Sequence, residues 1–419
     1  MLSRTVTKSI FVGARLIVVN ELLSLIPYKL IFAAYSFLPP LLVLSMGKGA
    51  VEVGLVSSIH LMGLFFGPLV WSKFAPVTNR KYLVILGYLG LFSGLSLLMI
   101  PGMIYPAVFV LAFFPQASYF AVLAELKRRK GSLGVALGRL EQISGAAWAL
   151  GLVLGFFGVE LLTLRQLILL LASLTLLSLP LVTIAVRSSV GGAVVNGLKE
   201  FERFGMWVLH TGGLQKVAVP KLKVDRRALS LYLFGAVFAL SSGLTFPQMP
   251  TFLKQVFNAP NLIYLCYFID ASTSAALNRL AGKARHRAYL YGYPFRILAY
   301  FALLASARLH DFPLLLLFYF LEGLAWGFIM IFFEYSGLKL GEEIYGTQLS
   351  LRLLVYSITS AVSGFVVNNV GFMSSFVAGL LLFASTFLFY RHFRKEVKNG
   401  EATESRTIPQ LPAELGTEA

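Results

Sequence analysis

The sequence LRQLILLLASLTLLSLPLVTIAV, residues 164–186, decides the fold class of this chain. It carries a single charge, Arg165, and its apolar and polar residues do not alternate. A helix of about 20 apolar residues crosses the hydrocarbon core of a bilayer, whereas the strands of a membrane barrel alternate apolar and polar positions. Because a backbone in lipid must satisfy its own hydrogen bonds, we predict that this stretch is a transmembrane helix.

Eleven other stretches have the same character, and the whole chain is apolar. Hydrophobic residues make up 57% of the sequence and charged residues only 13%, against about 25% charged residues in soluble domains. Lipid is therefore the expected solvent for the surface. We predict an all-α polytopic membrane protein with twelve transmembrane helices. The predicted spans are 22–45, 51–72, 82–101, 104–124, 136–159, 164–186, 229–252, 261–281, 288–307, 312–334, 347–369 and 372–390.

The basic residues lie in alternate gaps between these spans. Of the 36 Lys and Arg residues, Lys29 and Arg296 fall well inside spans, four lie in or next to the odd-numbered gaps, and the remaining thirty lie in or next to the even-numbered gaps and in the termini. Positively charged loops stay in the cytoplasm, so both termini are predicted to be cytoplasmic. The net charge of +17 is then a determinant of orientation, and we expect no nucleic-acid partner.

The longest gap between spans divides the chain into two halves. We predict a cytoplasmic lead-in at 1–20, a six-helix bundle at 21–187, a cytoplasmic linker at 188–228, a second six-helix bundle at 229–391 and a cytoplasmic tail at 392–419. The linker has apolar residues near helical spacing, which predicts an amphipathic helix at the membrane surface. The tail is polar and contains Pro409 and Pro412, which predicts disorder.

Several classes of enzyme site are missing from the sequence. The lone Cys266 excludes a disulfide within the chain, and the five His residues show no HExxH spacing. The chain also lacks the GxxxxGK[ST] phosphate loop, the GxSxG nucleophile turn and a GxGxxG dinucleotide motif. We therefore predict no enzymatic activity, no metal and no cofactor.

The two halves repeat a local pattern. Glu125 ends the fourth span and Arg139 lies at the start of the fifth, while Glu334 and Arg352 occupy the equivalent places in the second half. Parallel six-span repeats with a binding site between them are a known transporter architecture.

This layout resembles the major facilitator superfamily over essentially the whole chain. The sequences GPLVWSK at 67–73 and NRK at 79–81 are similar to the family motif G-x-L-A-D-[RK]-x-G-[RK]-[RK], with Trp71 in place of the Asp. Gln116 matches the Gln of the family motif R-x-x-Q-G. The resemblance implies a secondary transporter that works by alternating access, and we expect a monomer in the plasma membrane.

Charged residues inside spans are the strongest candidates for the mechanism. A charge at mid-span costs roughly 2.5–3.5 kcal/mol on insertion scales, so it persists where it faces a cavity or a partner. Glu322 and Asp270 each lie about ten residues into a span, and we predict that Glu322 first and Asp270 second carry a coupling proton. The alternative is an ion pair with Arg296 that only holds helices together. Lys29 could bind an acidic solute group or extend to the interface.

Polar and aromatic residues near these charges are predicted to line a solute pathway. Each alone is more often a helix-packing residue. The predicted pathway residues are Lys29, Gln116, Tyr119, Trp148, Gln248, Asp270, Glu322, Trp326 and Tyr356.

The repeated acid and base pairs predict a gate. We expect cytoplasmic salt bridges between Glu125 and Arg139 and between Glu334 and Arg352, which help to set the face that is closed. The alternative is static surface pairs worth at most about 1 kcal/mol.

The function that these patterns predict is secondary transport of a small organic solute, amphiphilic or zwitterionic, with protons as the preferred coupling ion. An uncoupled facilitator of the same fold is the first alternative. A non-transporting receptor or scaffold and an integral-membrane enzyme are the others.

Overall fold

The computed structural model describes residues 25–74, 80–127, 133–185 and 228–407. Within these ranges the chain is helical apart from short connections, and no strand is present. The predicted lead-in at 1–20 and all but the last residue of the predicted linker at 188–228 lie outside the described residues. Ten helical segments among the described residues are long and apolar enough to cross a membrane.

The first half of the chain forms six helical segments of membrane-spanning length. The first is helical over residues 25–35 and continues after a turn as α2, Leu38–Ser45. The others are α3 (Ala50–Phe74), α4 (Arg80–Leu98), α5 (Ile104–Phe113) with α6 (Gln116–Lys127), α7 (Leu133–Leu161) and α8 (Leu164–Ala185).

The second half repeats this order. Its helices are α11 (Leu229–Thr245) with the 3-10 turn η2 (Phe246–Gln248) and α12 (Met249–Phe257), α13 (Ile263–Ala284), α14 (Ala288–Leu309), α15 (Phe312–Leu340), α16 (Glu342–Val370) and α17 (Phe372–Thr407). Polar residues keep α13 and α14 outside the ten candidate spans, although both have 22 residues and pack against α15.

The stretch 164–186 presents one face to lipid and one to the protein. Leu167 and Leu171 of α8 are fully buried, whereas Leu177 and Ile184 are 69% and 77% exposed. Large apolar side chains with this exposure would be unfavourable in water. The predicted transmembrane character of this helix is thus consistent with its packing.

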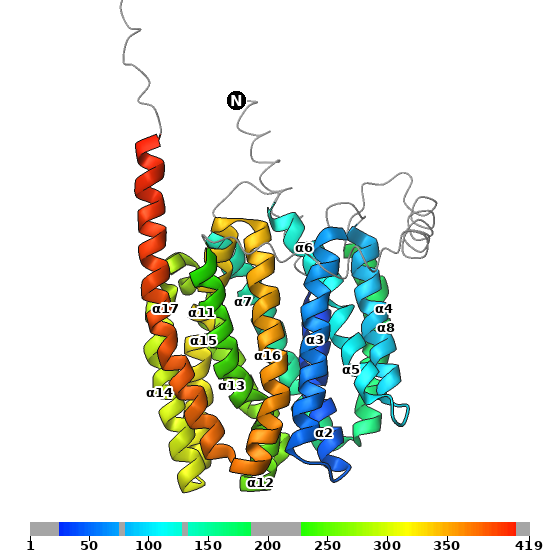
Figure 1. Cartoon of the computed structure of the whole chain (residues 1–419). Helices are drawn as coiled ribbons and strands as arrows, with labels where there is room; N and C mark the ends of the chain where they lie inside the picture. The colour runs from blue at the N-terminus through cyan, green and yellow to red at the C-terminus, as the bar shows by residue number, and fades with distance from the viewer. Residues whose placement is uncertain (1–24, 75–79, 128–132, 186–227, 408–419) are drawn as a thin grey trace, which may run out of the picture.

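The two halves lie side by side and meet along two pairs of helices. α3 packs along α16, and α7 packs along α13. Figure 1 shows α3, in blue, beside α16, in orange, at this boundary. Small residues allow the close approach: a Cβ at Gly54 would lie 2.7 Å from the carbonyl oxygen of Ser360, and one at Gly364 would lie 2.6 Å from that of Ala50.

The first helix of each half is interrupted at an equivalent place. The first span turns at Ser36 and Phe37, just before Pro39 and Pro40, and α11 gives way to α12 at η2, where Pro247 lies. Proline has no N–H and cannot continue the helical hydrogen-bond ladder, which explains both breaks. Interrupted helices at matching positions of two repeats are typical of transporter binding sites.

The two ends of the molecule can be distinguished in Figure 1. α2 and α12 lie at one end, which we call the outer end, and α17 extends past the opposite end. The last turns of α17, which carry several Lys and Arg residues, extend past that opposite end, which we call the basic end.

One prediction about helix extent is wrong. The tail was expected to be disordered from 392, but α17, which has 36 residues, continues to Thr407. The sequence from Arg391 to Thr407 has eight Arg, Lys and Glu residues and no proline, so it is compatible with helix. The span predicted at 104–124 is present as a candidate span over Ile104–Val122, which a turn at Phe114 and Pro115 divides into α5 and α6.

Candidate functional site

A cavity of about 320 Å³ lies between the two halves. This volume falls within the range of small-molecule sites. Both interrupted helices contribute to it, through Ser36, Phe37, Pro39 and Pro40 of the first half and Phe246, Pro247 and Pro250 of the second. The remaining residues of its lining are Phe32, Val56, Ser57, His60, Leu61, Leu64, Val108, Trp148, Tyr267, Asp270, Glu322, Trp326 and Tyr356.

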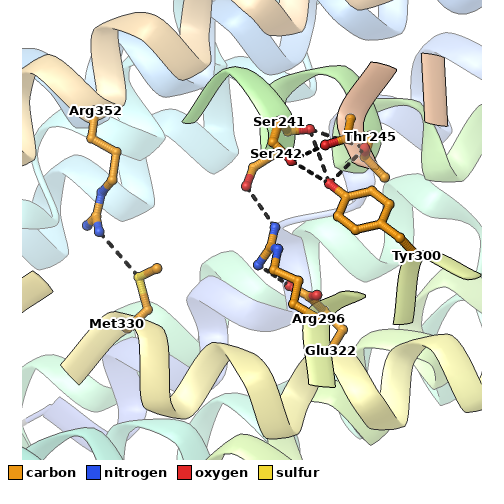
Figure 2. A network of polar contacts seen from close by, with 9 residues as sticks. Ser241, Ser242, Thr245, Arg296, Tyr300, Glu322, Met330 and Arg352 are labelled. Carbon is orange, nitrogen blue, oxygen red and sulfur yellow. Dashed lines mark hydrogen bonds and ion pairs between the residues drawn. The ribbon is translucent and has the colours of Figure 1, made fainter. Parts of the chain in front are cut away.

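Glu322 lines this cavity and is bound from behind by an arginine. Arg296 of α14 donates from Nη1 to Oε1 of Glu322 at 2.5 Å and from Nη2 to Oγ of Ser242 at 2.8 Å. Figure 2 shows the guanidinium between these two partners. The other carboxylate oxygen, Oε2, is buried and has no hydrogen-bond partner in the protein. Glu322 therefore has one carboxylate oxygen whose hydrogen-bonding capacity the protein does not use.

Aromatic rings surround Arg296 and exclude it from the cavity. Its guanidinium carbon lies 4.6 Å from the ring centre of Phe238 and 5.1 Å from that of Phe383, and its side chain is 0% exposed. Aromatic faces attract a cation and retain a buried guanidinium in place. Arg296 is therefore a fixed counter-charge for Glu322.

Asp270 lines the same wall of the cavity without a counter-ion. Among the described residues no salt bridge involves Asp270, and its Oδ1 is buried without a hydrogen-bond partner. A Cβ at Gly323 would clash with the backbone carbonyl of Asp270, so α15 approaches α13 closely at this point. This approach brings Asp270 near Glu322, the residue before Gly323.

Aromatic side chains form the remaining walls of the cavity. The ring of Phe32 lies 5.3 Å from that of Trp148 and 5.8 Å from that of His60, measured between centroids. Phe37 of the first half lies 4.6 Å from Tyr267 of the second. The contact between Phe37 and Tyr267 crosses the boundary between the halves. The cavity thus combines two acids on one wall with aromatic residues on the others.

Five of the nine predicted pathway residues line the cavity: Trp148, Asp270, Glu322, Trp326 and Tyr356. Four do not. Gln116 packs against Gly67 of α3, and Gln248 donates to the carbonyl of Ala50 and to Oγ of Ser363. Lys29 and Tyr119 lie in a separate group described below.

The sequence prediction missed the first-half residues Phe32, Ser36, Phe37, Ser57 and His60. Ser57, His60 and Leu64 recur at helical spacing along α3. The two polar residues, Ser57 and His60, interrupt an otherwise apolar face, and this interruption was a usable signal of a cavity. The two proline pairs were a second signal, because they mark the helix breaks that border the cavity.

A second group of charges lies toward the basic end. We call Lys29, Glu141, Glu334 and Arg352 the charged cluster; it takes two residues from each half. Lys29 Nζ lies 5.1 Å from the ring centre of Tyr119, whose hydroxyl donates to Oε1 of Glu141 at 3.4 Å. The carboxylate of Glu334 interacts electrostatically with the other three members.

The salt bridge predicted between Glu334 and Arg352 for the gate is not formed. Of the two predicted pairs, only Glu334 with Arg352 has both side chains described: no ion pair within 4.0 Å joins them, and Arg352 Nη1 donates to Sδ of Met330 at 3.4 Å instead (Figure 2). Its guanidinium lies 5.0 Å from the ring of Phe333, so it packs over α15 one turn before Glu334. Arg139 is exposed, and the side chain of Glu125 lies outside the described side chains.

No family model matches the sequence, and neither does any curated protein. Within the described residues, no three His, Cys, Asp or Glu side chains gather in a way that could hold a metal ion.

Solved structures do match the fold. The nucleoside transporter NupG superposes with a TM-score of 0.62 at 14% identity, covering 91% of this chain and 99% of that one. The human organic anion transporter MFSD10 (TETRAN) gives a TM-score of 0.62 at 17% identity, covering 90% and 99%. Both are transporters of the major facilitator superfamily. The resemblance seen in the sequence is confirmed at the level of structure: the chain has the major facilitator fold.

Proposed function

We propose that this protein is a secondary transporter that moves a small organic solute by alternating access, with the cavity between its halves as the solute site. One observation carries the proposal: the cavity is built by both halves and contains carboxylate oxygens that no protein group binds. When two halves rock about their boundary, a site between them changes its exposure from one side to the other.

Contacts between the halves support a state that is closed at the outer end. Tyr264 OH donates to the carbonyl of Ala34 at 2.7 Å, and Lys254 Nζ donates to that of Leu44 at 2.7 Å. Gln248 of the second half adds a bond to the carbonyl of Ala50 of the first. These hydrogen bonds would have to break for the cavity to open outward.

The charged cluster is the proposed counterpart at the basic end. Its members come from the first span, α7, α15 and α16, so relative motion of the halves changes their mutual distances. In a low-dielectric environment, a change in the distance between two charges changes their interaction energy strongly. We propose that this cluster, through Glu334 and Arg352, helps to set which end is closed.

Proton coupling is the preferred form of energy input. Both Glu322 and Asp270 remain candidates, but their surroundings differ: Arg296 already balances Glu322, whereas Asp270 has no ion-pair partner among the described residues. A proton arriving in the cavity would therefore remove an uncompensated charge at Asp270. The pairing of Glu322 with a caged arginine also suits an uncoupled facilitator, which is the second candidate.

The sidedness of the chain and its location are part of the proposal. The proposal has twelve spans, cytoplasmic termini and a plasma-membrane location; the distribution of basic residues supports the orientation of the termini. The protein would act as a monomer in the bilayer. The neighbours transport nucleosides and organic anions, and these solutes therefore belong in a first uptake panel.

The test is solute uptake by the purified protein in liposomes. The panel contains uridine, 3-phenylpropanoate and 2-phenylethylammonium, each measured with and without a pH gradient. A Ser57→Trp variant should fill the cavity and stop uptake. Leu177→Trp, on a lipid-facing side chain 69% exposed, is the matched control and should leave uptake unchanged. Uptake no faster than in protein-free liposomes for the whole panel, or equal uptake in both variants, would contradict the proposal.

A further inference from the structure

We infer that the cavity selects an organic cation, namely an ammonium or similar positive group attached to an aromatic or other apolar body. The inference rests on the proposed function only in taking this cavity as the solute site.

The charges that line the cavity do not cancel. Its lining contains Asp270 and Glu322 but neither Lys nor Arg. Arg296, behind the wall, forms an ion pair with Glu322 and is 0% exposed. When Asp270 is ionised, its negative charge is left over. A carboxylate without a counter-charge is unfavourable in a low-dielectric site, and a bound cation would supply the missing charge.

The hydrogen-bonding capacity of this wall matches the same ligand. Oδ1 of Asp270 and Oε2 of Glu322 are buried acceptors without donors in the protein, and Glu322 is only 2% exposed. An ammonium group carries up to three N–H donors and no acceptor. An anion placed here would meet two carboxylates, and like charges brought this close repel each other.

The aromatic walls favour a cation that carries an apolar body. Phe32 with Trp148, and Phe37 with Tyr267, lie on both sides of the boundary between the halves. Aromatic faces attract cations and also bury apolar surface. The preference is therefore for a compact amphiphilic cation, which differs from the solutes named for the two structural neighbours.

The helix breaks add acceptors to the same site. Pro39 and Pro40 lack the N–H groups that would bind the carbonyls of Tyr35 and Ser36 in an unbroken helix. Ser36 itself lines the cavity. An interrupted helix leaves these carbonyls without their usual helical donors, and such acceptors again suit a donor-rich cation.

The experiment compares three probes with the same phenyl body in binding to the full-length purified protein. They are 2-phenylethylammonium, the neutral 2-phenylethanol and the anionic 3-phenylpropanoate, followed by quenching of tryptophan fluorescence. We expect the ammonium to bind at least about tenfold more tightly than either analogue, equivalent to about 1.4 kcal/mol. Tighter binding of the neutral or anionic probe, or no binding of the ammonium at millimolar concentration, would overturn the inference.

Three variants locate the preference at Asp270. Asp270→Asn should lose the tenfold advantage of the ammonium while leaving 2-phenylethanol binding unchanged. Asp270→Glu should retain the advantage, which also protects the test against misfolding of the Asn variant. Glu160→Gln removes an exposed acid outside the cavity and should behave as the unmodified protein. Equal probe affinities for Asp270→Asn and the unmodified protein would contradict the assignment.

Uptake assays separate this inference from the proposed function. Cation binding that depends on Asp270, without any transport in liposomes, would leave the inference standing and contradict the transporter. Transport of uridine or 3-phenylpropanoate that 2-phenylethylammonium does not inhibit would leave the transporter standing and overturn the inference.

Discussion

Arg296 of α14 and Glu322 of α15 form an ion pair that is removed from water, with Nη1 2.5 Å from Oε1 and side-chain exposures of 0% and 2%. The pair joins two neighbouring helices of the second half and presents one carboxylate oxygen to the cavity. It is thus both a packing element and part of the wall of the candidate site.

Removing one partner of this ion pair should destabilise the protein more than removing both partners. Glu322→Leu alone leaves Arg296 buried without a counter-charge, which typically costs about 3–5 kcal/mol. The double variant Arg296→Leu/Glu322→Leu replaces both charges by apolar groups and should recover most of that loss. Thermal unfolding of the detergent-purified proteins measures both, with the exposed Arg308→Leu as the control. A double variant less stable than Glu322→Leu would contradict this account.

Asp270 and Glu322 should respond differently to a pH gradient. If Asp270 takes up the coupling proton, Asp270→Asn uptake should become independent of the gradient while exchange of labelled for unlabelled solute continues. Cation binding by the unmodified protein should weaken as the pH falls, because protonation of Asp270 removes the charge that attracts the solute. Uptake by Glu322→Gln that loses the gradient response, together with a normal response in Asp270→Asn, would assign the proton to Glu322 instead.

The sequence was sufficient to locate the helices but not to predict the rotation of each helix about its own axis. Lipid requires apolar helices, so runs such as 164–186 could be located from composition alone. Asp270 and Glu322 were both possible partners of Arg296, because a sequence does not fix which faces of three helices meet. The structure selects Glu322.

The missed cavity residues have a similar cause. A lone His60 in an apolar helix usually indicates packing, and its position opposite Trp326 and Asp270 depends on a contact between halves far apart in sequence. Lys29 and Tyr119 were assigned to the pathway by type, but they lie nearer the basic end. The cavity and the charged cluster differ in their depth along the helices. Hydropathy gives that depth only to within a few residues, so it could not separate the two.

The charged cluster should affect transport more than folding. Arg352→Gln removes one of its two cations, so Glu334 and Glu141 retain only Lys29 to balance them. We expect uptake to fall several-fold while the midpoint of thermal unfolding changes by a few degrees at most. Glu334→Gln/Arg352→Gln restores neutrality and should recover part of the uptake. Equal losses of uptake and stability in Arg352→Gln would indicate a structural role alone.

Closure at the outer end should depend on the close contact of α3 and α16. A side chain at Gly54 would press on the carbonyl of Ser360, whereas Gly49 has no heavy atom within 4 Å of the position a Cβ would take. Gly54→Val should therefore hold the outer end apart, and Gly49→Val should not. A single cysteine at Ser57, in a Cys266→Ser background, reports the difference through its rate of labelling by a membrane-impermeant thiol reagent applied from outside. We expect labelling to be several-fold faster with Gly54→Val than with Gly49→Val. Equal rates would mean that α3 and α16 do not separate when the cavity opens outward.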